Sequence, residues 1–230
     1  MDNNLQQWLT HMSQWEPIPI EHYSYLTHLK EQGFEPKIIW DVGACVLHWY
    51  HLALRIWPNA QIYCFEANDS CEFLYKRKQI DYHMGVLSNS DRRTVKFWNN
   101  PMHPGGSSYY KENPLQCAES AQIYTDVYAR LMQCQTLETI RRTRNWPLPS
   151  LLKMDVQGAE LDVLQGLGPS LQQVDHVILE LQHVEWNLGA PPYQIVVDWM
   201  HKNNFNLVTA KFSDNGPDAD YHFKRKDLCE

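Results

Sequence analysis

The feature that most constrains the fold is a series of short apolar runs, each containing or ending on an acid and each followed by a helical segment. The first two runs are residues 37–41 and 61–66, and the same pattern returns at 151–155 and 177–181. Apolar strands that alternate with helices are typical of βαβ units, in which helices cover both faces of a mostly parallel sheet. We therefore predict an α/β fold with a doubly wound sheet.

The segments between and after these runs complete the expected pattern. The expected helices are 47–56, 70–78, 159–164 and 195–202, and the further expected strands are 82–87, 94–98, 206–210 and 221–226. Residues 1–34 carry apolar side chains at helical spacing, interrupted by Pro17 and Pro19. We expect this segment to form one or two helices packed on a main domain of residues 35–230.

Acidic residues fall at or near the carboxyl ends of four expected strands. They are Asp41, Glu66, Asp155 and Glu180. Ligands of open α/β sheets bind at this edge, close to the point where the strand order reverses. Four carboxylates there favour a cationic or polyhydroxyl ligand over a phosphate.

The turn after the first strand, Asp41-Val42-Gly43-Ala44, contains a glycine that lets the backbone approach a ligand. Glu66 follows some 25 residues after Asp41, close to the offset of about 20 residues at which an acid binds ribose hydroxyls in nucleoside-binding folds. Leu47 stands where a glycine-rich loop would carry another glycine, which argues against a pyrophosphate site and a nicotinamide-dependent oxidoreductase. S-adenosylmethionine has no phosphate and a positive sulfonium, and fits the acidic edge better.

The composition argues against two broad classes of function. The 230 residues include 20 Lys and Arg against 27 Asp and Glu, a formal net charge of −7 at pH 7. Nucleic-acid binding needs an excess of basic residues, and a membrane span needs about 20 consecutive apolar residues. We expect neither a nucleic-acid partner nor a membrane span. The six cysteines form no metal-finger spacing, so we expect free thiols in a reducing compartment, and hence a cytoplasmic protein.

The segment 152–166, LKMDVQGAELDVLQG, resembles the K-I-D-V-E/Q-G-A-E-x-x-V-L-x-G signature of the FkbM-type S-adenosylmethionine-dependent methyltransferases. Weaker similarities, in the family's order, extend over about residues 35–228. They fall at 41–44, 66–67, 106–112, 135–140, 178–182, 187–191 and 220–227. The resemblance implies a Rossmann-like class I methyltransferase that O-methylates a hydroxyl, commonly on a sugar. A deoxyhexose such as rhamnose would suit a pocket rich in aromatic and acidic groups.

Two residues depart from the family's D-V-G-A-N-x-G turn, because Cys45 and Leu47 replace the asparagine and the second glycine. The departure leaves a second hypothesis open: a degenerate methyltransferase fold that acts as a binding or docking module of a larger carbohydrate-assembly protein. The chain is then a domain of a longer protein.

An alcohol acceptor is a weak nucleophile until it loses its proton, so a general base is expected near the transferred methyl group. Asp155 is expected to organise that site, although it is also placed to cap the helix that follows. Glu180 and His183 are the candidate base pair, and His103 is expected to approach the acceptor. The oxygens of Asp155, Glu180 and Glu160 also suit a divalent metal, but nothing in their spacing requires one.

The remaining candidates bind cofactor or acceptor. The expected cofactor-binding residues are Asp41, Gly43, Ala44, Cys45, Glu66, Ala67 and Asp155. The expected acceptor-binding residues are Ser107, Ser108, Tyr109, Glu160, Trp186 and Asn187. Three of the latter lie in the long segment 99–134, which is typical of a lid or binding loop.

Overall fold

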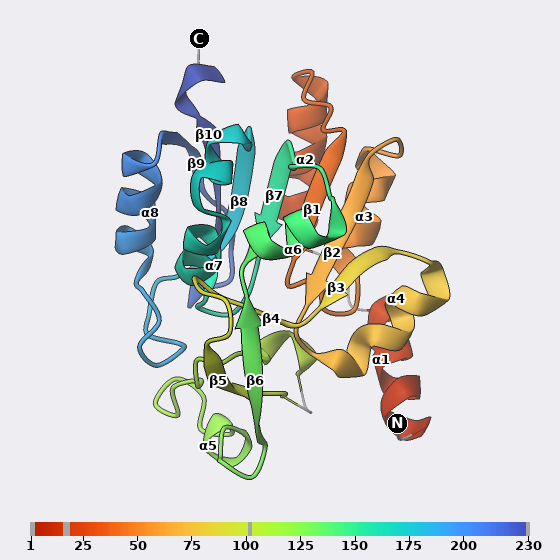
Figure 1. The fold of residues 1–230 in the computed structure, drawn as a ribbon, viewed down its shortest axis with the longest axis vertical. Helices are drawn as coiled ribbons and strands as arrows, with labels where there is room; N and C mark the ends of the chain where they lie inside the picture. The colour runs from red at the N-terminus through yellow and green to blue at the C-terminus, as the bar shows by residue number, and fades with distance from the viewer. Residues whose placement is uncertain (1–2, 16–18, 101–102, 229–230) are drawn as a thin grey trace.

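A mostly parallel β-sheet forms the centre of the protein (Figure 1). In the computed structural model, which describes residues 3–15, 19–100 and 103–228, this sheet has seven strands in the order β3-β2-β1-β7-β8-β10-β9. Pro17, the first of the two expected helix breakers, and Cys229 lie outside the described residues. The strands are β1 Ile38–Val42, β2 Gln61–Glu66, β3 Asp81–Met84, β7 Leu151–Met154, β8 His176–Gln182, β9 Phe205–Asp214 and β10 Asp218–Arg225.

The strand order reverses between β1 and β7. From β1 the chain moves outward through β2 and β3, then returns to place β7 and β8 on the other side of β1, all five strands being parallel. β10 then pairs antiparallel with β8, and β9 pairs antiparallel with β10. The predicted doubly wound α/β fold is confirmed, and its ligand-binding edge is at the carboxyl ends of β1 and β7.

Helices cover both faces of the sheet (Figure 1). One face packs against the helices α1 Asn3–Trp15, α2 Ile20–Glu31, α3 His48–Ile56 and α4 Glu72–Lys78. The other face packs against α6 Leu137–Arg144, α7 Glu160–Leu167 and α8 Tyr193–Lys202. Among the described residues, no helix has both the length and the apolar character that crossing a bilayer requires.

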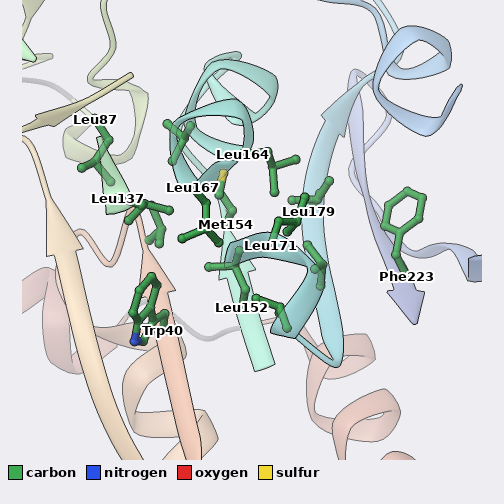
Figure 2. Packing of buried hydrophobic residues seen from close by; sticks show 14 of the residues in the cluster. Trp40, Leu87, Leu137, Leu152, Met154, Leu164, Leu167, Leu171, Leu179 and Phe223 are labelled. Atoms are coloured by element: carbon green, nitrogen blue, oxygen red, sulfur yellow. The ribbon is translucent and has the colours of Figure 1, made fainter. Parts of the chain in front are cut away.

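Alternation along the strands divides the apolar side chains between two cores. Ile39 and Leu151 face the α1–α4 side, whereas their neighbours Trp40 and Leu152 face the α6–α8 side. Figure 2 shows the second core, where Trp40, Leu152 and Met154 meet side chains from α6 and α7. Each fully buried side chain of this size stabilises the fold by roughly 1.5–3 kcal/mol.

A second, smaller sheet lies beyond the carboxyl edge of the main sheet (Figure 1). It comprises β4 Val86–Leu87, β6 Ala129–Gln135 and β5 Thr94–Trp98, with the short helix α5 Ser120–Ile123 nearby. The sequence prediction of one strand over 82–87 is wrong, because the chain leaves the main sheet at Gly85. β6 and α6 were not expected: β6 is mostly exposed and lacks the apolar alternation of a half-buried strand.

Several expected boundaries also shift. α7 begins one residue later and continues three residues further than expected, α8 begins two residues earlier, and β9 and β10 are longer than predicted. The expected N-cap role of Asp155 is wrong, since the N-cap residue of α7 is Ala159 and no side chain caps it.

A buried polar network attaches α2 to the sheet. The hydroxyl of Tyr25 lies 2.7 Å from Nδ1 of His222 and donates to Oγ1 of Thr209, and Nε2 of His222 lies 2.8 Å from Nδ1 of His176. Burial lowers the pKa of His176 to about 4 and, together with His176 itself and Lys224, lowers that of His222 to about 3. Both imidazoles are therefore neutral at pH 7 in the folded protein.

We predict that acidification destabilises the fold through this network. Each histidine takes up a proton more readily in the unfolded chain, with an ordinary pKa of about 6.5, so the free energy of unfolding falls as the pH decreases from 6.5 towards 4. Urea unfolding at a series of pH values measures the slope. His222→Gln should flatten it, because one titrating group is lost, while His201→Gln on the exposed end of α8 should leave it unchanged.

Candidate functional site

Two adjoining cavities open at the carboxyl edge of the main sheet. The inner cavity lies between Gly43, Glu66, Leu87, Phe97 and Val163. The outer cavity, with a volume of about 670 Å³, extends from the β1 turn towards α2, β8 and β10. The two cavities share Gly43, Cys45, Pro104, Gly105 and Asp155. Asp155 therefore borders both spaces.

Gly43 sits where the β1 turn meets the backbone after β7. Its φ is +80°, and a Cβ at this position would lie 1.7 Å from the carbonyl oxygen of Asp155. Cys45 and Leu47, which replace the family's asparagine and glycine, also have positive φ values of 42° and 73°. Glycine and asparagine adopt positive φ at the lowest conformational energy. Cys45 and Leu47 keep the same turn at a higher conformational energy.

The carboxylate of Glu66 organises the turn from the end of β2. It accepts backbone hydrogen bonds from Cys45 at 2.7 Å, Ala67 at 2.8 Å and Asn68 at 2.6 Å. Burial raises the pKa of Glu66, while these three donors oppose that shift. Glu66 and Ala67, both expected at the cofactor site, line the inner cavity.

The other walls of the inner cavity are largely apolar. They come from the small sheet and from α7, through Val86, Leu87, Phe97 and Val163. Within the described part of the chain, no lysine or arginine lines this cavity. A flat, uncharged heterocycle fits such walls, whereas a phosphate would meet no basic side chain.

A buried lysine lies beneath the site, on β7. Nζ of Lys153 is 3.4 Å from Oδ2 of Asp155 and 3.9 Å from Oδ1 of Asp41. Burial alone would lower the pKa of Lys153, but these carboxylates and those of Glu180 and Asp220 raise it. Burial raises the pKa of the fully buried Asp41 to about 6, although Lys153 opposes the shift. The lysine is therefore charged and compensates the acids around it.

Asp155 and Glu180 form a carboxyl pair in the outer cavity. Nε2 of Gln157 donates to Oδ1 of Asp155 at 2.8 Å and to Oε2 of Glu180 at 2.9 Å. Burial and the charge of Asp155 raise the pKa of Glu180 well above its usual range. Burial opposes ionisation of Asp155, but Lys153 and hydrogen bonds from Glu180 and Gln157 lower its pKa. A proton shared by this pair is therefore favoured on Glu180 over Asp155.

The structure brings most of the sequence candidates to the two cavities. Ser107, Ser108 and Tyr109, expected at the acceptor, line the inner cavity. Ala44, His103, Glu180 and Trp186 line the outer cavity.

Four candidates lie away from both cavities. Asp41, within β1, is fully buried and faces Lys153. Glu160 accepts from the backbone nitrogens of Val156 and Gly158, and burial raises its pKa to about 7. Asn187 is fully buried and hydrogen-bonds to Gln182 and to the backbone of Tyr110. Glu160 and Asn187 thus hold loops of the site in place through hydrogen bonds to the backbone.

His183, the fourth, does not meet Glu180. Glu180 lies within β8, whereas His183 follows Gln182, the last residue of that strand. Nε2 of His183 lies 2.9 Å from the hydroxyl of Tyr221, and its ring packs edge-on against Tyr193. The structure therefore does not form the expected Glu180–His183 pair.

Sequence reasoning missed several residues of the outer cavity. Lys153 and Gln157 were part of the recognised signature, but no role was predicted for either. Asp218 and Asp220 stand at the start of an antiparallel strand, so the rule of acids at strand ends did not find them. No local pattern points to His22 of α2. Within the described residues, no group of three or more histidine, cysteine or acidic side chains is arranged to hold a metal ion.

A mostly parallel sheet ordered in this way, with a glycine turn after β1 and an acid at the end of β2, defines a Rossmann-like methyltransferase fold. The family model described as the methyltransferase FkbM domain matches residues 41–207. The chain belongs to the FkbM methyltransferase family.

Individual relatives are distant. A hexuronic acid methyltransferase from Haloferax volcanii is 24% identical over 162 residues, which are 66% of this chain and 59% of that protein. This chain therefore spans less than two thirds of the relative's length. An O-methyltransferase family protein from Burkholderia thailandensis has a TM-score of 0.51 at 6% identity, covering 96% of this chain and 59% of that one. A magnesium protoporphyrin IX methyltransferase from Synechocystis has a TM-score of 0.45 at 10% identity, covering 98% of this chain and 85% of that one.

We predict that Gly43→Ala destabilises the protein by about 2 kcal/mol or more beyond the cost of a positive φ, because the new Cβ overlaps the Asp155 carbonyl. Gly189→Ala is the matched control, since φ is +78° there and a Cβ would have no neighbour within 4 Å. Chemical denaturation compares the two variants. Equal destabilisation would contradict a role for close contact at Gly43.

We predict that Lys153→Met lowers the free energy of unfolding by about 3–5 kcal/mol at pH 8, because two carboxylates lose their buried counter-charge. The loss should be smaller at pH 5, where these carboxyl groups can take up protons. Lys211→Met, which removes a half-exposed partner of Asp214, should cost less than about 1 kcal/mol at either pH. Denaturation at both pH values provides the measurement.

Proposed function

We propose that the protein is an S-adenosylmethionine-dependent O-methyltransferase that methylates a sugar hydroxyl. The observation that carries the proposal is the arrangement of the two cavities. One has an acid at the end of β2 and no basic side chain among its described residues. It meets, at Asp155, a larger cavity that is lined by several carboxyl groups. Such an arrangement suits a phosphate-free nucleoside cofactor beside a polyhydroxyl acceptor.

The inner cavity fits the cofactor. Glu66 would hold the ribose hydroxyls, the turn at Gly43 would allow the methionine end to approach the backbone, and Leu87 and Phe97 would enclose the adenine. S-adenosylmethionine supplies an electrophilic methyl group on a sulfonium. The acidic surroundings contributed by Asp155 and Glu66 favour that positive charge.

At the acceptor, Asp155 is the proposed general base. Its pKa is lowered, it borders both cavities, and Gln157 and Lys153 fix its orientation. Glu180, whose pKa is raised, hydrogen-bonds to Asp155, so a proton shared by the pair favours Glu180 and leaves Asp155 as the base. A positioned base is worth about 10²–10⁴ in rate, and alignment of acceptor and methyl group about 7–11 kcal/mol of the barrier.

The proposed acceptor is a saccharide or glycoconjugate. The distant relative named as a hexuronic acid methyltransferase supports this class of acceptor. Trp186 lines the outer cavity and offers a ring for sugar stacking, while His103 is an exposed imidazole at its rim. A deoxyhexose such as rhamnose, which has an apolar face, remains our preferred acceptor.

We predict that Glu66→Gln weakens S-adenosylmethionine binding at least tenfold, because an amide is a poorer acceptor for ribose hydroxyls and for the turn's N–H groups. Isothermal titration calorimetry measures the affinity. Glu72→Gln, on the surface of α4, should leave it within twofold. Absence of binding to wild-type protein at millimolar cofactor would contradict the proposed function.

The docking-module hypothesis makes a different prediction. It is motivated by Cys45 and Leu47, which hold left-handed backbone where the family has asparagine and glycine. Under that hypothesis the protein binds cofactor but transfers no methyl group to any glycan. Mass spectrometry of a glycan panel incubated with labelled cofactor distinguishes the two.

A further inference from the structure

One wall of the outer cavity comes from parts of the chain outside the family match. His22 of α2 and Asp220 of β10 both line the cavity, whereas the family match covers residues 41–207. Nε2 of His22 lies 2.8 Å from Oδ2 of Asp220, and the two residues are only 6% and 3% exposed. Helix α2 is thus joined to the main sheet at the wall of the outer cavity.

Asp220 continues a row of carboxyl groups across the sheet. It stands directly opposite Glu180 in the β8–β10 ladder, so both side chains leave the same face. Glu180 in turn hydrogen-bonds with Asp155, the residue that follows β7. The row therefore begins at the proposed base and ends at His22.

The charges of the outer cavity are unbalanced. Six acidic residues line it: Glu112, Glu119, Asp155, Glu180, Asp218 and Asp220. Among the described residues, its only lysine or arginine is Lys153, which already faces Asp41 and Asp155. The other basic side chains of its lining are three histidines, of which His22 pairs with Asp220. Sugar carboxylates are ordinarily recognised by arginine or lysine, while neutral hydroxyls donate well to carboxylates. An acidic acceptor would meet repulsion here.

Two buried nitrogens of residues that line the outer cavity lack partners. Nδ1 of His22 and Nε1 of Trp49 make no hydrogen bond to any described residue, and both side chains line the outer cavity. Trp49, like His22, is 6% exposed. Buried polar atoms are normally paired, so these two nitrogens are exceptions, and both belong to residues that line the cavity.

We propose that this wall selects an uncharged, hydroxyl-bearing sugar over a uronic acid, and that Asp220, held by His22, is the acceptor-binding carboxylate that enforces the choice. The inference rests on the proposed function. Under this inference the chain methylates a neutral sugar, and so differs in acceptor from its relative named as a hexuronic acid methyltransferase, although the two share the family domain.

The test uses matched acceptors with the complete chain. Methyl β-D-glucoside and methyl β-D-glucuronide differ only at C6, as do the corresponding galactosides, and methyl α-L-rhamnoside serves as a deoxy acceptor. Transfer of label from methyl-labelled S-adenosylmethionine gives kcat/KM for each. We expect the neutral member of a pair to be preferred at least tenfold. Asp220→Asn should reduce that preference and raise KM for the neutral sugar, while the calorimetric affinity for S-adenosylhomocysteine stays within twofold.

A control on the same helix separates binding from folding. Tyr25→Phe removes a polar anchor of α2 one turn after His22 but lies outside the lining of the cavity. It should leave KM unchanged, whereas His22→Asn should raise it. Equal effects of the two variants would overturn the assignment.

The remaining outcomes are also decisive. Equal or better methylation of the uronides would overturn the inference and leave the proposed function standing. Absence of transfer to every glycoside, with S-adenosylhomocysteine still bound, would overturn both the saccharide acceptor and the inference.

Discussion

The rest of the site depends on the ion pairs of Lys153 with Asp41 and Asp155, which join β1 to the end of β7. Lys153 lies at the reversal of strand order, with Asp41 on the neighbouring β1 and Asp155 just beyond β7. Burying an unpaired carboxylate there would be costly, so the lysine allows two acids to occupy the ligand-binding edge of an otherwise apolar sheet. It also lowers the pKa of Asp155 and so favours the ionised form of that carboxyl group.

From this point the two cavities follow. Gly43 brings the β1 turn against the Asp155 carbonyl. The carboxylate of Glu66 accepts hydrogen bonds from the backbone N–H groups of Cys45 in that turn and of Ala67 after β2. The small sheet closes the inner space, and α2 closes the outer one. Core packing on either face of the main sheet fixes these elements, whereas hydrogen bonds and ion pairs set the chemistry between them.

Much of the fold could be predicted from the sequence because strands and helices leave local periodic signals. The runs at 37–41, 61–66, 151–155 and 177–181 all became strands of the main sheet. The sequence does not predict β6, because most of its side chains are exposed. It predicts one strand over residues 82–87, because the chain passes from the main sheet to the small sheet there without a change in apolar character. Inner-cavity candidates such as Glu66 were found by their offset from the turn. The expected pairing of Glu180 with His183 relied on closeness in sequence, but β8 ends between the two residues, and His183 contacts Tyr221 instead.

The sequence by itself determined the alternating α/β order, the acids at the strand ends and the signature at 152–166, since all of these are written in consecutive residues. Only the tertiary structure decided which acids meet. His22 and Asp220 are 198 positions apart, and Asp220 reaches Glu180 through the register of an antiparallel pair formed at the end of the chain. Such contacts depend on which strands become neighbours and on which face a helix packs. No local pattern of residues encodes that choice.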